Sequence, residues 1–295
     1  MASITATTPL WIAAGTLLTG QGKEFFTHWR KAGASFGVDE IHDFRVASRR
    51  LREGLALFAP CFPGKDASRL GKKIKHLTQL LGTMRNTDEA IILFSELSEA
   101  ETRECREETE QLIATLTRER ESVSKELRRE LRSLDPAPLR SAFRALRRHP
   151  KIFGPVEVDP FQPITNFAEG AIGARELAVR ELIPQAKHEE QAEAQHRLRI
   201  AVKHLRYRLE ILEPLLGDDF ARLHQGLKRY QDLLGKLHDL DVFADLARER
   251  LSETAGREQL LEVLSARRKA LHAAFCRLLK ETPLKSIGEQ ARAAL

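Results

Sequence analysis

Two stretches of the chain carry nearly the same sequence, 154 residues apart. Residues 42–52 read His-Asp-Phe-Arg-Val-Ala-Ser-Arg-Arg-Leu-Arg, and residues 196–206 read His-Arg-Leu-Arg-Ile-Ala-Val-Lys-His-Leu-Arg. The matched positions are His42 with His196, Arg45 with Arg199, Ala47 with Ala201, Arg49 with Lys203, Leu51 with Leu205 and Arg52 with Arg206. A motif that recurs at a fixed spacing predicts a repeated structural unit.

A second pair of matching blocks follows the first at an offset of 153 residues. Its matches are Lys75 with Lys228, Leu80-Leu81-Gly82 with Leu233-Leu234-Gly235, and Asp88 with Asp241. Two blocks in the same order at nearly one offset predict an internal duplication. We expect residues 1–150 to form the first unit and residues 151–295 the second, with the boundary in the proline-containing stretch 150–163.

The pattern of apolar residues is helical nearly throughout. Apolar residues recur every three or four positions, and the residues that favour strands are scarce, with aromatics at 6%. The sequence therefore predicts an all-α fold made of two helical bundles. Breaks between helices are expected at residues 33–37, 60–64, 135–138, 150–163, 214–219 and 283, and also at Asn86–Glu89 and Asp239, where we predict N-caps that open new helices.

On a helical wheel, each repeated motif separates basic from apolar residues. In the first motif a basic stripe about 80° wide lies opposite an apolar face, and the second motif repeats this arrangement. The first stripe contains His42, Arg45, Arg49 and Arg52, and the second contains His196, Arg199, Lys203 and Arg206. The opposite apolar faces contain Phe44, Ala47, Leu51, Leu55 and Phe58, and Leu198, Ala201, Leu205, Leu209 and Leu212.

The charge of the stripes is of one sign, although solvated helix faces normally mix signs. Like charges at these spacings repel, and the repulsion recurs in both halves, which indicates an anionic ligand that relieves it. The net formal charge is +7 over residues 42–85 and +4 over residues 196–238, but −4 over residues 89–134. The plain alternative is a solvated amphipathic face. Lys75 and Lys228 extend the basic surface, and Lys72, His76 and Arg229 are marginal candidates.

The sequence lacks the motifs that are typical of several functional classes. The chain has no Gly-rich phosphate loop, nucleophile elbow or HExxH motif, so we expect neither an enzyme with catalytic residues nor a cofactor. Asp88 and Asp241 fit capping or arginine pairing better than catalysis. The three cysteines contain no CxxC, and the histidines lack further ligands at metal-site spacing, so no metal site is expected.

Two other functions remain open from the residues alone. A histidine phosphotransfer protein would use His42 or His196 as the phosphate acceptor. A nucleic-acid-binding protein would need aromatic platforms beside the basic face, where only Tyr207 is found. Gly82 and Gly235 lie on the basic side, where they serve a close approach of a ligand, a helix–helix contact or a helix end.

The repeated motif His-x-x-Arg-[Val/Ile]-Ala-x-[Arg/Lys]-x-Leu-Arg resembles the CHAD family (conserved histidine α-helical domain), as does the Leu-Leu-Gly block. The resemblance covers nearly the whole chain, so both halves together would form one CHAD domain. It implies two bundles related by pseudo-two-fold symmetry, and inorganic polyphosphate bound in a basic groove or pore between them. It further implies an association with polyphosphate granules. The three scattered cysteines and the lack of an apolar run of about 20 residues predict a cytoplasmic protein without a membrane partner. One departure is His204, which stands where the first motif has Arg50.

Overall fold

The computed structural model describes residues 4–100, 105–152 and 157–295. The helices of the first half are α1 (Leu10–Ser35), α2 (Val38–Leu57), the 3₁₀-helix η1 (Ala59–Cys61), α3 (Gly64–Ala100), α4 (Arg106–Ser133) and α5 (Pro136–Arg148). Those of the second half are α6 (Ile164–Ala186), α7 (Ala192–Ile211), α8 (Glu213–Leu216), α9 (Asp219–Arg250), α10 (Ala255–Glu281) and α11 (Leu284–Ala293). These residues include no strand, so the predicted all-α fold is confirmed.

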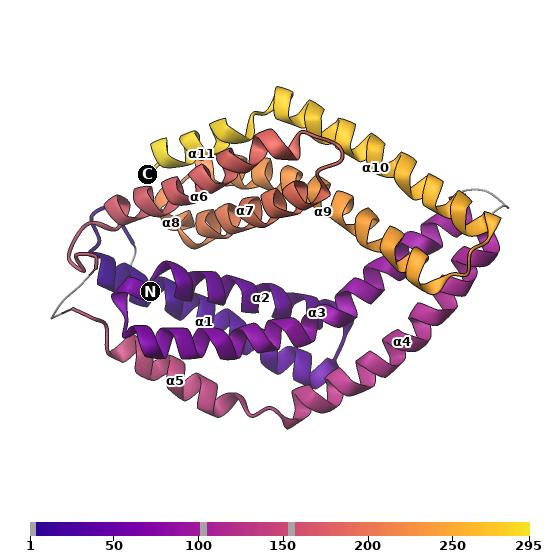
Figure 1. Cartoon of the computed structure of the whole chain (residues 1–295). Coiled ribbons are helices and arrows are strands. Elements are labelled where there is room, and N and C mark those ends of the chain that lie inside the picture. Colours follow the sequence, from indigo (N-terminus) through magenta and orange to yellow (C-terminus); the bar gives the residue numbers. More distant parts are fainter. Residues whose placement is uncertain (1–3, 101–104, 153–156) are drawn as a thin grey trace.

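The same order of helices occurs in each half. Two helices of 20 residues or more, a short helical turn, two long helices and a shorter last helix follow one another twice. Figure 1 shows the two resulting bundles, with α2 of the first beside α7 of the second. The two helices that carry the repeated basic motif are therefore packed against each other. We call the basic faces predicted from the sequence the α2 stripe (His42, Arg45, Arg49 and Arg52) and the α7 stripe (His196, Arg199, Lys203 and Arg206).

The hydrophobic core consists of two clusters. The larger one takes buried side chains from both halves, and it includes a stacked pair, Phe58 and Phe167, whose ring centroids are 5.9 Å apart. The smaller one lies where the hairpin of α3 and α4 meets the hairpin of α9 and α10, around Phe94 and Phe243. The halves thus touch at two places, and α2 and α7 belong to the larger contact (Figure 1).

The starts of α1 and α6 are joined by a reciprocal pair of backbone hydrogen bonds. The amide of Leu10 donates to the carbonyl of Gln162, and the amide of Ile164 donates to the carbonyl of Thr8, both at 2.9 Å. Thr8 and Gln162, like Leu10 and Ile164, are 154 residues apart, which is the offset of the sequence repeat. Reciprocal contacts of this kind are what a two-fold axis between two like units produces. The duplication itself stays a prediction.

Two of the expected helix breaks are wrong. Helix α3 continues through Asn86–Glu89, and α9 continues through Asp239. On both sides of these positions the apolar spacing holds, and Met84 and Phe94 in α3 are buried like Leu237 and Phe243 in α9. Asn and Asp cost a helix interior only a few tenths of a kcal/mol, and the burial of these side chains outweighs that cost.

No helix among the described residues is both long and apolar enough to cross a membrane.

Candidate functional site

The apolar faces of α2 and α7 fix the direction in which the two stripes point. Phe44, Leu51, Leu198 and Leu205 are at most 1% exposed, as the wheel predicted. Each helix buries these side chains in the larger core, so the opposite basic face is turned away from its own bundle. Hydrophobic burial on one side therefore positions the cations on the other.

The central part of the α2 stripe lies close to the central part of the α7 stripe. The pKa of Lys203 falls to about 8 because the ammonium is buried and because Arg49, Arg199, Arg45 and Arg52 all raise the cost of its charge. Three of these arginines come from α2 and one from α7. We call these five residues the central cation cluster.

The central cation cluster holds guanidinium groups that are partly removed from water. Burial lowers the pKa of Arg199, and Arg49 lowers it further while Asp239 opposes the shift. Burial, and then Arg49, likewise lower the pKa of Arg52. The Nε atom of Arg199 is buried and has no hydrogen-bond partner among the described residues. A buried donor without a partner carries a free-energy cost that an oxygen-rich ligand would remove.

A pair of histidines borders the cluster. His196 of the α7 stripe lies against His238 of α9, with 3.1 Å between their Nδ1 atoms and 4.1 Å between ring centroids. Burial and the charges of Arg199 and Lys203 lower the pKa of His196. Burial, Arg199 and His196 lower the pKa of His238 to about 4. His238 belongs to the second repeated block but is not among the site residues predicted from the sequence.

Arg206 is bound inside its own half. Its Nη1 lies 2.7 Å from Oε1 of Glu210 and 3.1 Å from Nε2 of His224, and its Nε donates to Gln231 at 2.8 Å. The matching residue Arg52 instead lines a hollow between α2 and α3. The two equivalent positions of the repeat therefore have different surroundings.

The remaining predicted residues lie around the cluster. His42 and Arg45 line a small hollow beside α3 with Met84 and Asp88. Lys75 and the marginal Lys72 line the hollow next to Arg52. Lys228 and His76 are exposed on α9 and α3. Arg229 lines a separate hollow between α9 and α10.

Two buried carboxylates join α2 to α7 next to the C-terminal ends of the stripes. Glu53 of α2 receives hydrogen bonds from Arg208 at 2.7 Å and Arg175 at 3.3 Å, and its Oε2 lies 2.7 Å from Nδ1 of His204. Burial raises the pKa of Glu53, but the hydrogen bonds of His204 and Arg208 outweigh it and lower the pKa to about 2. In the other direction, Nε of Arg50 donates to Glu210 at 2.7 Å.

These pairs explain the departure noted in the motif. Arg50 and His204 occupy matching positions, and each reaches a carboxylate of the opposite helix. Both residues serve the contact between the halves. These ion pairs between the halves could not be predicted from the sequence, because a helical wheel does not show which acid of one helix lies opposite which base of another.

Each of the two repeated aspartates forms an ion pair with an arginine. Asp88 pairs with Arg120 of α4, and Asp241 pairs with Nε of Arg268 of α10 at 2.5 Å. Arginine pairing was one of the two expected roles, and it holds for both residues. The described residues contain no group of three side chains suited to a metal ion. At Gly82 and Gly235 a Cβ would meet nothing within 4 Å in the described structure, so neither glycine marks a close helix contact.

The fold and this arrangement define a class: an all-α protein in which two helices from opposite halves present cations to one another. A family model described as the CHAD domain matches residues 17–248. The chain belongs to the CHAD family.

Two solved structures have a similar fold. The crystal structure of the CHAD domain from the plant Ricinus communis matches with a TM-score of 0.60 and 21% identity, over 100% of this chain and 95% of that one. PptA from Streptomyces chartreusis matches with a TM-score of 0.64 and 16% identity, over 96% of this chain and 99% of that one. At these identities the likeness concerns the fold alone. No curated protein sequence matches the chain.

Proposed function

We propose that this protein binds inorganic polyphosphate through the α2 and α7 stripes and does so without catalysis or a cofactor. The observation that carries the proposal is the central cation cluster, in which Lys203 stands among four arginines at the contact of the two halves. Such a cluster destabilises the free protein, and a polyanion would relieve the repulsion. Membership of the CHAD family supports the same ligand.

Phosphate chains suit the residue types of the stripes. Arginine offers a planar fork of donors to phosphate oxygens, and lysine a point charge. From its first to its last residue each stripe rises about 15 Å along the helix, over ten steps of 1.5 Å. His42 and His196 would donate hydrogen bonds once protonated, a form that nearby phosphate favours.

Nucleic acid is the weaker alternative. Its bases would need exposed aromatic rings beside the basic surface. Tyr207, which directly follows Arg206 of the α7 stripe, is only 4% exposed, and Arg206 covers its ring at 5.1 Å from the centroid. This ring is unavailable for stacking, which favours a ligand without bases.

Histidine phosphotransfer is the second alternative, with His42 or His196 as acceptor. It would leave a covalent phosphate on the protein after incubation with a phosphodonor, which mass spectrometry detects. We further propose that the protein acts in the cytoplasm in association with polyphosphate granules. A fluorescent fusion that stayed away from the granules would contradict that location.

Thermal unfolding tests the main proposal. Wild type and the double variant Arg49→Glu/Lys203→Glu are heated with and without long-chain polyphosphate. A ligand that binds the folded state raises Tm, so we expect an increase for wild type and none for the double variant. The control Lys236→Glu/Arg277→Glu makes the same change of charge at exposed positions outside the stripes and should respond like wild type. An unchanged Tm of wild type would refute the proposal.

A further inference from the structure

The hollow beside Arg52 is open because its walls are made of small residues. It lies between the end of α2 and the start of α3, and Arg52, Lys72 and Lys75 border it. The other lining residues are Leu55, Ala56, Ala59, Gly64, Ala67, Ser68 and Gly71. Long cationic side chains thus surround a floor that offers room for a ligand.

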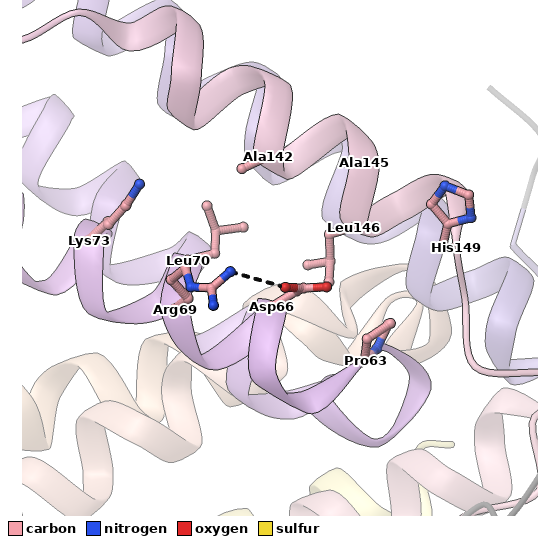
Figure 2. A pocket seen from close by; sticks show the side chains of 9 residues that line it. All are labelled: Pro63, Asp66, Arg69, Leu70, Lys73, Ala142, Ala145, Leu146 and His149. Carbon is pink, nitrogen blue, oxygen red and sulfur yellow. Dashed lines mark hydrogen bonds and ion pairs between the residues drawn. The ribbon is translucent and has the colours of Figure 1, made fainter.

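Two more hollows continue from this one around the start of α3. The next shares Gly64, Ser68 and Lys72 with it and adds Lys65 and Arg69. The third shares Arg69 and lies between α3 and α5, where Lys73 and His149 border it (Figure 2). Ala142 and Ala145 of α5 leave this third hollow open.

The hollows therefore form one basic path, which we call the exit track: Lys65, Arg69, Lys72 and Lys73, reached from Arg52 and Lys75. All four of its cations are exposed. One acid stands among them, Asp66, which lies 3.5 Å from Nη1 of Arg69. A path of exposed and mainly positive charges, joined to the central cation cluster at Arg52, is suited to a flexible polyanion.

In the second half, larger side chains stand at the positions that correspond to this path. By the offsets of the repeat, Ala56 corresponds to Glu210, Ala67 to Phe220 and Gly71 to His224. These larger side chains contact one another: the Phe220 and His224 rings are 5.3 Å apart, and Nε2 of His224 lies 2.9 Å from Oε1 of Glu210. Glu210 also binds Arg206, the counterpart of Arg52.

The charges of the path are missing from the second half as well. Lys65 corresponds to Asp218, Lys72 to Gln225 and Lys73 to Gly226. Arg69 alone keeps its charge, as Arg222, which lies 2.6 Å from Asp219. The two halves thus differ at the same register in both shape and charge.

We infer that a long polyphosphate leaves the central cation cluster on one side only, along the exit track of the first half. This inference rests on the proposed function and adds a preference for long chains. A short chain fits on the stripes alone, whereas a long chain gains further contacts at Arg69, Lys72 and Lys73. The residues that line the three hollows include no Phe, Tyr or Trp on which bases could stack, and His149 is their one ring for stacking, which favours polyphosphate over nucleic acid here too.

The test compares long-chain polyphosphate with tripolyphosphate on two charge variants. The track variant is Arg69→Gln/Lys72→Gln/Lys73→Gln. Its matched control, Lys236→Gln/Arg277→Gln/Lys280→Gln, removes the same charge from exposed positions of the second half. We expect the track variant to bind long chains about tenfold more weakly, since surface ion contacts contribute a few tenths to 1 kcal/mol each. Both variants should keep wild-type affinity for tripolyphosphate within about twofold, because neither changes a residue of the two stripes.

Salt dependence gives a second readout. Each phosphate contact adds roughly 0.7 to the slope of log affinity against log salt for single strands, so the track variant should lose about two units with long chains. A third variant, Gly71→His, copies the side chain that fills the hollow in the second half without removing a lysine or arginine. A Cβ at Gly71 meets nothing within 4 Å, so the fold should accept it. Gly71→His should also weaken the binding of long chains and leave the binding of tripolyphosphate unchanged.

Several outcomes would overturn the exit track. If the control loses as much affinity for long chains as the track variant does, net charge alone determines that affinity. An equal loss for tripolyphosphate would place these cations in the central site. Single-stranded DNA is titrated as a third ligand, and a loss of affinity confined to it would assign the track to nucleic acid. If wild type binds neither phosphate ligand, the proposed function is refuted. If wild type binds both ligands and every variant binds them like wild type, only the exit track is refuted.

Discussion

Lys203 is the residue whose charge the site controls most strongly. Its pKa of about 8 lies well below the ordinary 10.5, because burial and four neighbouring arginines penalise the ammonium. Negative phosphates beside the same nitrogen would reverse the balance of charge and raise the pKa again. Binding should therefore draw protons from solution at pH values near and above 8.

The first prediction concerns this proton uptake. At pH 9, calorimetry of polyphosphate binding in two buffers of different ionisation enthalpy should show proton uptake by wild type. Lys203→Arg keeps the charge but cannot lose its proton in this range, so most of the uptake should disappear. Equal uptake in both proteins would mean that a group other than Lys203 accounts for it.

The second prediction compares matched residues of the two stripes. Arg45→Ala and Arg199→Ala should weaken polyphosphate binding by similar factors, because both residues belong to the central cation cluster. Each variant should unfold at a temperature near that of wild type, since both side chains lie opposite the apolar faces. Titration with polyphosphate measures the first effect and thermal unfolding the second. Complete loss in one variant and no loss in the other would rule out a shared site.

At the scale of elements, periodicity was sufficient for α2 and α7. The wheel placed Leu51 and Leu205 in the core, and both are at most 1% exposed. Local signals failed at Asn86 and Asp239, where capping residues stand inside α3 and α9, because packing along a long helix outweighs a local preference. The site was predicted only in part, since partners such as His238 depend on how separate helices meet.

The third prediction separates the two faces of these helices. Leu51→Ala or Leu205→Ala should lower the free energy of unfolding by about 2–5 kcal/mol, because each leaves a cavity in the core. Arg49→Glu/Lys203→Glu should leave the free protein as stable as wild type or slightly more so, since it removes like-charge repulsion. Urea unfolding without ligand measures both. Strong destabilisation by the charge reversal would mean that the stripes support the fold.

The fourth prediction concerns Glu53, which links α2 to α6 and α7. Glu53→Gln should destabilise the protein by about 3–5 kcal/mol at neutral pH, because it leaves buried cations without their carboxylate. The pKa of Glu53 is about 2, below its ordinary 4.5. Its contribution is therefore present above pH 4.5 and is lost as the pH falls toward 2, so the difference from wild type should shrink in acid. Urea unfolding across this pH range checks it.

For the whole molecule, the charge distribution matters more than the net charge of +6. The two stripes bring cations from distant parts of the chain to one contact, so several phosphates would be held at once. The fifth prediction is that polyphosphate affinity falls steeply with salt, with a log–log slope of several units, at roughly 0.7 to 0.9 per contact by analogy with nucleic acids. Titrations at increasing salt measure it. A flat dependence would contradict an electrostatic site.

The reciprocal bonds between the starts of α1 and α6 also have a consequence for how the chain folds. Helical proteins usually fold fast because their contacts are local, whereas this contact closes a segment of some 150 residues. The packing of α2 on α7 spans a similar separation. During synthesis, the first half's arginines emerge long before Lys203 does. The central cation cluster comes into existence only after the second half has been made and has docked, so a nascent chain cannot present the complete site.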